Sequence, residues 1–483
     1  MTQSKIIVGN CLDVLRRLPS DSVHCAVSSP PYFGLRDYGL PPSIWGGAAD
    51  CFHQWGDEIV HDGRDHVPGV NSEFKDRAVA EARRKKGTNG AFCVHCDAWR
   101  GCLGHEPTPD LYIEHLVLIF AEVRRILRPE GTLWLNLGDS YNTHPNGPSL
   151  AKSGLGGSLN GHAEYRNAHG LRKTVKIPGL KPKDLIGIPW MAAFALRAEG
   201  WWLRSDIVWE KPNCQPESTR DRPTRSHEFI FLLTKSAAYF YDADAIREPR
   251  TTKGAEKNTG TVDWATRPAG KKGSNDRQDI LRIRPGSRPP GYFGHILGRN
   301  KRDVWRVTTK PFKEAHFATF PPDLIEPCVK AGASEGGCCA ACGAPQERAT
   351  GRACEKCSEM IPTQGKSCPA CGHVRDWKAG RDAAPEMLSD WSATHSGTPR
   401  LPGNFASKTV DMGWKPTCGH TDVAGTAPTI VLDPFFGAGT TGLVAQRLGR
   451  CFIGIEMNRT YAEMALARIE KDKGVAEPEE ITR

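Results

Sequence analysis

Four consecutive residues near the start of the chain, Ser29-Pro30-Pro31-Tyr32, combine a hydroxyl, two prolines and an aromatic ring. They follow the apolar run 23–27, which predicts a short buried strand. Because proline has no backbone N–H, the chain must leave the sheet here. Ligands bind at the carboxyl ends of strands in open α/β sheets. The tetrapeptide is therefore either a rigid exit from the strand or part of a binding site.

A glycine-rich turn near the other end of the chain is the second feature that can bind a ligand. Residues 429–458 read as a strand ending at Asp433, the turn, a helix, and a strand ending at Glu456. Its glycines match the G-x-G-x-x-G spacing of dinucleotide sites, at Gly437, Gly439 and Gly442. However, Asp433 and Pro434 stand where a pyrophosphate needs backbone amides, and we expect too few residues after the turn for a dinucleotide fold.

A cofactor with a ribose and a cationic centre but no phosphate suits this turn better. Glu456 can accept hydrogen bonds from both ribose hydroxyls, and glycine lets the backbone approach closely. S-adenosylmethionine carries these groups. Tight packing of the turn is the structural alternative.

Cysteine usage indicates metal sites. The chain has 17 cysteines, many of them in Cys-x-x-Cys pairs, and an odd count without a leader argues against a disulfide framework. The strongest pattern is a four-thiolate ribbon of Cys354, Cys357, Cys368 and Cys371. Free thiols are the alternative.

Two further Cys/His sets have spacings that zinc accepts. One consists of Cys51, His53, Cys93 and Cys96, with Cys102 and His105 as substitute ligands. The other consists of Cys339, Cys342, Cys418 and His420, with Cys338 as an alternative to Cys339. We expect structural zinc in more than one site, stabilising loops that have no core of their own.

The pattern of apolar residues predicts an α/β fold that is assembled from separated segments. The 483 residues suggest two or three domains. Residues 110–128 predict a helix ending at Pro129, 131–139 a buried strand, and 188–240 a helix with two strands. The strands missing around the glycine turn must come from the amino-terminal region, which requires a circularly permuted order. Neither a membrane span nor a signal peptide is predicted, so we expect a cytoplasmic protein.

Positive charge is concentrated in one segment. The net charge is +9, and residues 243–315 hold 17 Lys and Arg against 8 Asp and Glu, an excess of 17 − 8 = 9. A local positive field of this kind favours a polyanionic partner, although a solvated basic loop is the alternative.

Together these motifs resemble the DNA amino-methyltransferases that modify exocyclic nitrogens, in the permuted order with the catalytic motif before the cofactor motif. Ser29-Pro30-Pro31-Tyr32 is similar to the family's (Asp/Asn/Ser)-Pro-Pro-(Tyr/Phe) motif, and the glycine turn to its cofactor motif. The group usually has an acidic residue where Asn10 stands. The implied cofactor contacts are Asn10, Phe320, Asp433, Phe435, Gly437, Gly439, Thr440, Thr441 and Glu456.

The resemblance implies a Rossmann-like S-adenosylmethionine-dependent methyltransferase fold with zinc-binding insertions and a target-recognition region. The core would comprise 1–50, 108–242 and 426–483, a cofactor-flanking helix 316–337, a Cys/His insertion 51–107, a target-recognition region 243–315, and a Cys-rich insertion 338–425. In the target-recognition region the candidate DNA contacts are Arg282, Arg284, Arg288, Arg299, Arg302 and Arg306.

The implied activity is site-specific methylation of double-stranded DNA at cytosine N4, which the serine of the catalytic motif favours, with adenine N6 as the alternative. Carbon-5 methylation needs a cysteine nucleophile, and Cys328 after Pro327 reads instead as a packing residue. The substrate could instead be RNA or a protein side chain, and a non-enzymatic zinc-ribbon protein that binds nucleic acid is the rival from another class. No membrane partner is expected; a homodimer, a separate restriction endonuclease, and a bacterial or phage host stay open.

Overall fold

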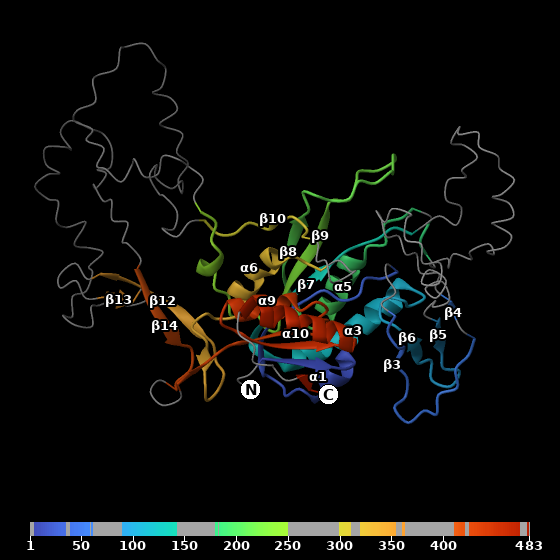
Figure 1. Ribbon diagram of the computed structural model, residues 1–483, viewed down its shortest axis with the longest axis horizontal. Coiled ribbons are helices and arrows are strands. Elements are labelled where there is room, and N and C mark those ends of the chain that lie inside the picture. Colours follow the sequence, from blue (N-terminus) through green and yellow to red (C-terminus); the bar gives the residue numbers. More distant parts are fainter. Residues whose placement is uncertain are drawn as a thin grey trace, which may run out of the picture. The chain divides into compact units, whose positions relative to one another are not determined.

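The computed structural model describes residues 4–34, 39–57, 59–60, 89–142, 179–181, 183–249, 299–310, 319–353, 360–362, 410–420, 425–473 and 481–482. The chain, whose described elements are labelled in Figure 1, divides into two compact units. The first comprises Met1–Asp242, Arg302–Glu347 and Pro416–Arg483, and the second comprises Ala243–Lys301 and Arg348–Lys415. The second unit overlaps the predicted target-recognition region and the predicted Cys-rich insertion.

A nine-stranded sheet organises the first unit, in the order β10-β8-β9-β7-β2-β16-β17-β1-β18. Strand β9 is antiparallel to both of its neighbours, and all the other pairs are parallel. The strands are β1 (Lys5–Val8), β2 (Val23–Ser28), β7 (Leu127–Leu137), β8 (Trp202–Glu210), β9 (His227–Thr234), β10 (Val304–Arg306), β16 (Ile430–Asp433), β17 (Cys451–Glu456) and β18 (Ile481–Thr482).

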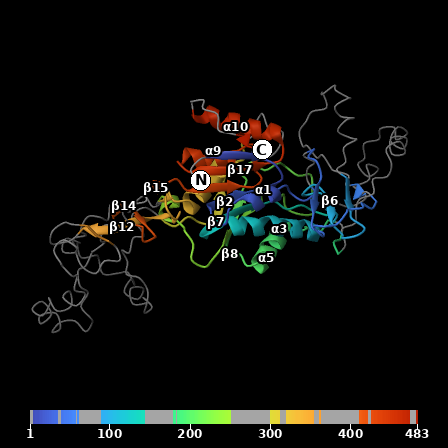
Figure 2. The ribbon, with the colours of Figure 1, turned by 90° about the horizontal axis from the view of Figure 1, so that it is seen from below.

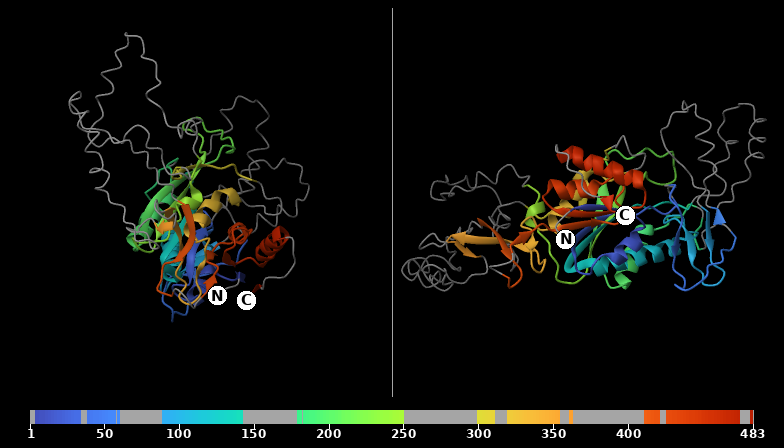
Figure 3. Two further views of the ribbon diagram at one scale, coloured as in Figure 1. Left: turned by 90° about the vertical axis from the view of Figure 1, so that its left-hand side faces the viewer. Right: turned by 60° about the horizontal axis from the view of Figure 1, so that its bottom comes forward.

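The strand order shows the predicted circular permutation. Strand β16 from the carboxyl-terminal region pairs with β2 from the amino-terminal region, with Leu432 opposite Ala26. On its other side β16 pairs with β17, which pairs in turn with β1. The last described strand, β18, also pairs with β1, so distant parts of the sequence lie side by side (Figure 3). Because these strands are parallel, the carboxyl ends of β1, β2, β16 and β17 meet at one edge, called the carboxyl edge here.

Helices cover both faces of the sheet (Figure 2). On one face α1 (Cys11–Arg17), α3 (Pro109–Ile126) and α5 (Ile188–Ala198) pack together, and their buried residues form the main core with apolar residues of the strands. On the other face α6 (Pro322–Gly332), α9 (Thr440–Arg447) and α10 (Arg459–Lys473) pack together. None of the helices in the described ranges has the length and apolar character needed to cross a membrane.

Helix α3 illustrates how local sequence and long-range pairing compete. The Thr108 side chain accepts the Leu111 N–H at 3.2 Å, and Pro109 occupies the first turn, so the helix start follows local rules. The predicted end at 128 is wrong by two residues, because Leu127 pairs with Val23 and already belongs to β7.

Three smaller sheets complete the described structure. In the first unit, β3 (Ser43–Trp45), β4 (Ile59–Val60), β5 (Asn89–Phe92) and β6 (Trp99–Gly101) form a sheet in the order β3-β6-β5-β4, and β11 (Cys338–Cys339) pairs with β15 (Thr426–Ala427). The second unit contains the short 3₁₀ helix η2 (Asp244–Ile246) and most of a sheet formed by β12 (Gln346–Ala353), β13 (Met360–Pro362) and β14 (Val410–Pro416).

Candidate active site and metal centres

Asp433, at the end of β16, ties the glycine turn to the neighbouring strand. It is 1% exposed, and its Oδ1 accepts hydrogen bonds from the Ser28 hydroxyl at 2.7 Å and from the Phe435 N–H at 3.0 Å. Its Oδ2 accepts the Thr441 hydroxyl at 2.7 Å. Burial raises the pKa of this carboxyl to about 6. Ser28, which sequence reasoning missed, thus links the two ligand-binding motifs across 405 residues.

The glycines of the turn fall into two kinds. Gly437 has a φ of +51°, and a Cβ on it would meet its nearest non-neighbouring atom only at 4.0 Å, so this part of the turn has room for a ligand. By contrast, a Cβ on Gly439 would lie 2.8 Å from Ala465, and one on Gly442 would lie 2.6 Å from Phe436. These two glycines let the turn pack against its own core.

Glu456, at the end of β17, faces the open part of the turn. Its Oε2 accepts the Gly437 N–H at 2.8 Å, and its Oε1 accepts the Asn458 N–H at 2.8 Å. Burial raises the pKa of this carboxyl. Each carboxylate oxygen has a further lone pair, so the group can also accept two neighbouring hydroxyls of a ribose.

The remaining predicted cofactor residues are already engaged with the protein to different degrees. Asn10 caps α1, since its Oδ1 accepts the Leu12 N–H at 2.9 Å, while its Nδ2 donates to the Ser43 hydroxyl at 2.8 Å. Thr440 is buried, and its hydroxyl oxygen accepts a hydrogen bond from the Arg468 guanidinium at 2.9 Å. Cofactor contact by these two side chains stays a prediction.

Phe320 lies two residues before α6, next to its N-cap residue Pro321. The far end of α6 lies at the opposite side of the sheet, where β1, β2, β16 and β17 begin (the amino edge). There the Ala333 carbonyl accepts a hydrogen bond at 2.9 Å from Arg450, the residue before β17. The start of α6 therefore points towards the carboxyl edge, the side on which Glu456 lies. Cys328 is fully buried in this helix, as expected for a packing residue.

The tetrapeptide Ser29-Pro30-Pro31-Tyr32, which is the predicted catalytic motif, leaves β2 at the same edge. Ser29 is half-buried, and its hydroxyl donates to the Tyr32 hydroxyl at 3.3 Å. The Pro31 carbonyl accepts the Tyr112 hydroxyl at 2.7 Å, whereas the Pro30 carbonyl accepts no hydrogen bond from the described residues. The Pro30 carbonyl and the Ser29 hydroxyl are therefore among the acceptors that this loop can offer to a ligand.

Comparison with known proteins identifies the family. The profile of the N6/N4 DNA methylases, described as "DNA methylase", matches residues 23–340 and 401–467. The chain belongs to this DNA methylase family. It is an S-adenosylmethionine-dependent DNA amino-methyltransferase of the N4-cytosine or N6-adenine type, so the non-enzymatic zinc-ribbon alternative is wrong.

Curated relatives match the methyltransferase over nearly its whole length. M.XycI from Xanthomonas campestris pv. cyanopsidis is 31% identical over 97% of this chain and 88% of the relative. M.Cfr9I from Citrobacter freundii is 31% identical over 96% of this chain and 86% of the relative. M.SmaI from Serratia marcescens is 30% identical over 96% of this chain and 90% of the relative. All three are described as Type II methyltransferases.

The first Cys/His cluster of the methyltransferase is held by the small sheet of β3, β4, β5 and β6. The ligand atoms of all four members lie within 4.8 Å of one another, namely Cys51, His53, Cys93 and Cys96. The Cys51 and Cys93 sulfurs are 3.8 Å apart, close to the spacing of about 3.8 Å between thiolates that bind one tetrahedral zinc. The substitute ligand Cys102 lies elsewhere, since its thiol donates to the Leu40 carbonyl.

Two contacts join this cluster's small sheet to the carboxyl edge. Ser43 of β3 accepts the hydrogen bond from Asn10 described above. The Gly104 carbonyl, shortly after β6, accepts the N–H of Gly34, two residues after Tyr32, at 2.8 Å.

The second Cys/His cluster lies at the amino edge of the sheet. The ligand atoms of its members are also within 4.8 Å of one another, namely Cys339, Cys342, Cys418 and His420. The alternative Cys338 points elsewhere, towards the Ala427 carbonyl at 3.4 Å.

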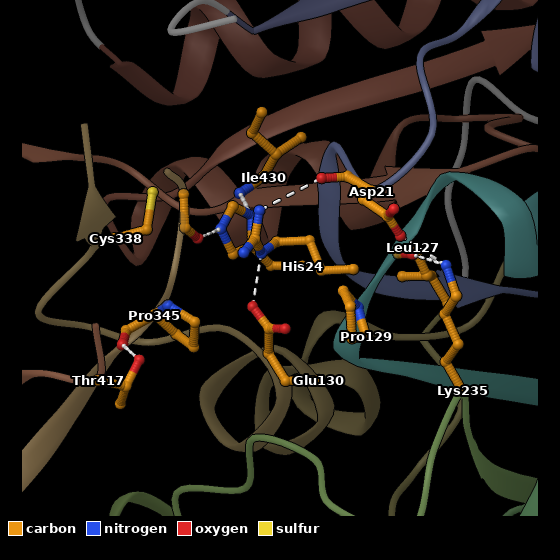
Figure 4. A network of polar contacts seen from close by, with 12 residues as sticks. Asp21, His24, Leu127, Pro129, Glu130, Lys235, Cys338, Pro345, Thr417 and Ile430 are labelled. Carbon is orange, nitrogen blue, oxygen red and sulfur yellow. Dashed lines mark hydrogen bonds and ion pairs between the residues drawn. The ribbon is translucent and has the colours of Figure 1, made fainter. Parts of the chain in front are cut away.

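His24 joins this second cluster to the sheet (Figure 4). Its Nδ1 accepts the Ile430 N–H at 3.1 Å, so its Nε2 carries the proton and donates to the Gly343 carbonyl at 2.9 Å. His24 is 6% exposed, and burial lowers its pKa to about 4. The neutral ring thus connects β2, β16 and the loop that follows Cys342.

Several predicted residues lie outside the described residues. These are Cys354, Cys357, Cys368, Cys371, Arg282, Arg284 and Arg288. Of the other basic candidates, Arg299 pairs with Glu248 at 2.8 Å, and Arg306 is largely exposed beside Glu210.

Proposed function

We propose that this methyltransferase modifies the exocyclic N4 of cytosine at a specific site in double-stranded DNA. Support comes from the loop at the end of β2, whose available acceptors include the Ser29 hydroxyl and the Pro30 carbonyl. An exocyclic amino group has two hydrogens, and the pair of acceptors matches them. Serine at the first position of this motif favours cytosine over adenine as the target base in the family.

These acceptors address the main difficulty of the reaction. The lone pair of an exocyclic amine is delocalised into the ring, so the nitrogen is a poor nucleophile. Hydrogen bonds from the amino group to Ser29 and Pro30 stabilise the form in which the lone pair stays on nitrogen. S-adenosylmethionine supplies the methyl group, and Tyr32 stacks on a base that has been flipped out of the duplex. Asp433 and Ser28 hold the cofactor turn and the catalytic loop together.

Mass spectrometry of nucleosides from unmethylated DNA, incubated with the protein and S-adenosylmethionine, tests this function. We expect N4-methylcytosine. N6-methyladenine would keep the mechanism and reverse the target base. If varied DNA sequences yield neither modified base, the proposed substrate is wrong, and RNA would then be tested in the same assay.

We also propose that both Cys/His clusters of the first unit bind structural zinc, and that Cys354, Cys357, Cys368 and Cys371 form a further zinc ribbon. The mutual distances in the two described clusters support this, since two sets of four ligand atoms each converge within 4.8 Å. Elemental analysis of the purified protein is expected to give about three zinc ions per chain.

The DNA contacts are proposed to include Arg299, Arg302 and Arg306 together with Arg282, Arg284 and Arg288. The Type II relatives support a role beside a separate restriction endonuclease in the cytoplasm of a bacterial or phage-infected cell. Measuring DNA affinity at several salt concentrations tests the contacts. We expect the affinity to fall steeply as the salt concentration rises, and Arg-to-Ala substitutions at these positions to make this fall less steep.

A further inference from the structure

The Tyr32 hydroxyl lies in a polar cluster that stacking on a base does not require. It donates to Glu228 Oε2 at 2.8 Å and lies 3.1 Å from Asn136 Oδ1. Strand β9 runs antiparallel to β7, with Phe229 opposite Leu137, so Glu228 sits at the carboxyl edge. Burial raises the pKa of Tyr32 well above its usual range, so the hydroxyl keeps its proton and remains a donor.

Glu228 is itself held from two sides. The Lys211 ammonium forms an ion pair with Oε1, and the Asn136 Nδ2 donates to Oε2 at 3.3 Å. The Lys211 and Glu228 side chains are only 19% and 16% exposed. The Lys211 nitrogen also lies 4.2 Å from the centre of the Trp209 ring. With both carboxylate oxygens engaged, Glu228 has one defined position.

The ring of Tyr32 is also located by the backbone beneath it. A Cβ on Gly138, directly after β7, would lie 2.5 Å from the Tyr32 Cε2. The ring therefore rests on the backbone at Gly138, while its hydroxyl is anchored by Glu228. Two independent contacts fix the plane of the ring and its rotation.

We propose that Glu228 is a positioning residue, which holds the Tyr32 ring in the orientation needed to stack on the target base, with Lys211 fixing the Glu228 carboxylate. This inference rests on the proposed function, in which Tyr32 stacks on the flipped base. Methyl transfer needs the reacting atoms aligned, and a displacement of about 1 Å can cost on the order of 100-fold in rate. A rotating Tyr32 would allow such a displacement.

A double-mutant cycle between Glu228→Ala and Tyr32→Phe tests the proposal. Single-turnover methylation is measured at saturating S-adenosylmethionine and DNA. We expect each single variant to lose about 10- to 100-fold in rate, because both remove the same anchoring hydrogen bond. The double variant should be no slower than the slower single variant. Affinity for S-adenosylmethionine should stay close to the wild-type value, whereas Glu228→Ala should lower the melting temperature because Lys211 loses its partner.

Two further variants separate positioning from folding. Glu228→Gln keeps an acceptor for Tyr32 and should recover part of the rate, and it replaces Glu228→Ala in the cycle if that variant does not fold. Glu122→Ala, which breaks the half-buried ion pair with Arg125 on α3, serves as the matched control and should keep the wild-type rate.

The outcomes distinguish the two proposals. Losses that multiply in the double variant would overturn the positioning role, because Glu228 would then act independently of the Tyr32 hydroxyl. Wild-type protein that methylates no DNA would instead contradict the proposed function.

Discussion

The two Cys/His clusters of the first unit use the same kinds of ligand but attach to opposite edges of the sheet. The first is joined to the carboxyl edge through the Ser43 bond to Asn10 and the Gly104 bond to Gly34. The second is joined to the amino edge through the Gly343 bond to His24. A metal at the first cluster would organise residues beside the catalytic loop, whereas a metal at the second would organise only the support of the fold. Similar chemistry therefore need not imply similar roles.

Removing one ligand from each cluster should give the largest difference. We expect Cys93→Ser to lower the methylation rate about 10- to 100-fold, because the loop at Gly34 loses its support. We expect Cys342→Ser to lower the melting temperature while the rate at a permissive temperature stays within about threefold of wild type. Each variant should also contain one zinc ion fewer. Equal losses of rate in both variants would show that the two clusters do not differ in function.

The free energy of unfolding should depend on pH through His24, which lies at the amino edge. His24 is held neutral with a pKa of about 4, below its ordinary 6.5, so the unfolded chain binds a proton that the folded chain excludes. The contribution of the neutral His24 to the free energy of unfolding is complete above about pH 6.5. It is lost as the pH falls towards 4, by about 3 kcal/mol in total. Urea unfolding of wild type and His24→Gln at pH 7.5 and 5 should show the steeper loss in wild type.

Asp433 at the carboxyl edge should respond in the opposite sense. Its folded pKa of about 6 lies above the ordinary value of 3.8, so its buried charge lowers stability as the pH rises through this range. In the same unfolding series, Asp433→Asn should remove this loss. If both variants changed the pH profile in the same direction, one of the two assigned charge states would be wrong.

The smallest expected effect comes from single hydrogen bonds near each cluster. Ser43→Ala removes the partner of Asn10, and Thr417→Val removes the 2.7 Å bond to the Pro345 carbonyl. Each should reduce the free energy of unfolding by about 1 kcal/mol. Only Ser43→Ala should also weaken S-adenosylmethionine binding, by a few-fold, as titration calorimetry can measure. Weaker binding in both variants would contradict the separation of the two edges.

Sequence reasoning reached the parts of the site that depend on local spacing. A Cys-x-x-Cys pair places two sulfurs in one tight turn, and Ser29-Pro30-Pro31-Tyr32 follows its strand directly, so both patterns can be read from neighbouring residues. The permuted fold could also be predicted, because the catalytic motif precedes the cofactor motif while the strands around the glycine turn must come from the amino-terminal region.

The contacts between distant segments could not be read in this way. Ser28 meets Asp433 only because β2 lies between β16 and β7, and Tyr32 meets Glu228 only because β9 runs antiparallel beside β7. A half-buried glutamate at the start of a strand carries no signal of its partner. The early start of β7 has the same origin, since pairing with β2 decides where α3 ends.

The position of β16 and β17 between β2 and β1 has a consequence for biosynthesis. Strands β1 and β2 are synthesised before β16 and β17, yet they cannot pair with each other, because the two strands from residues 430–456 must lie between them. Throughout translation of the intervening segments, β1 and β2 expose unpaired edges that can aggregate. The nascent chain is therefore expected to depend on chaperones until residues 430–456 emerge.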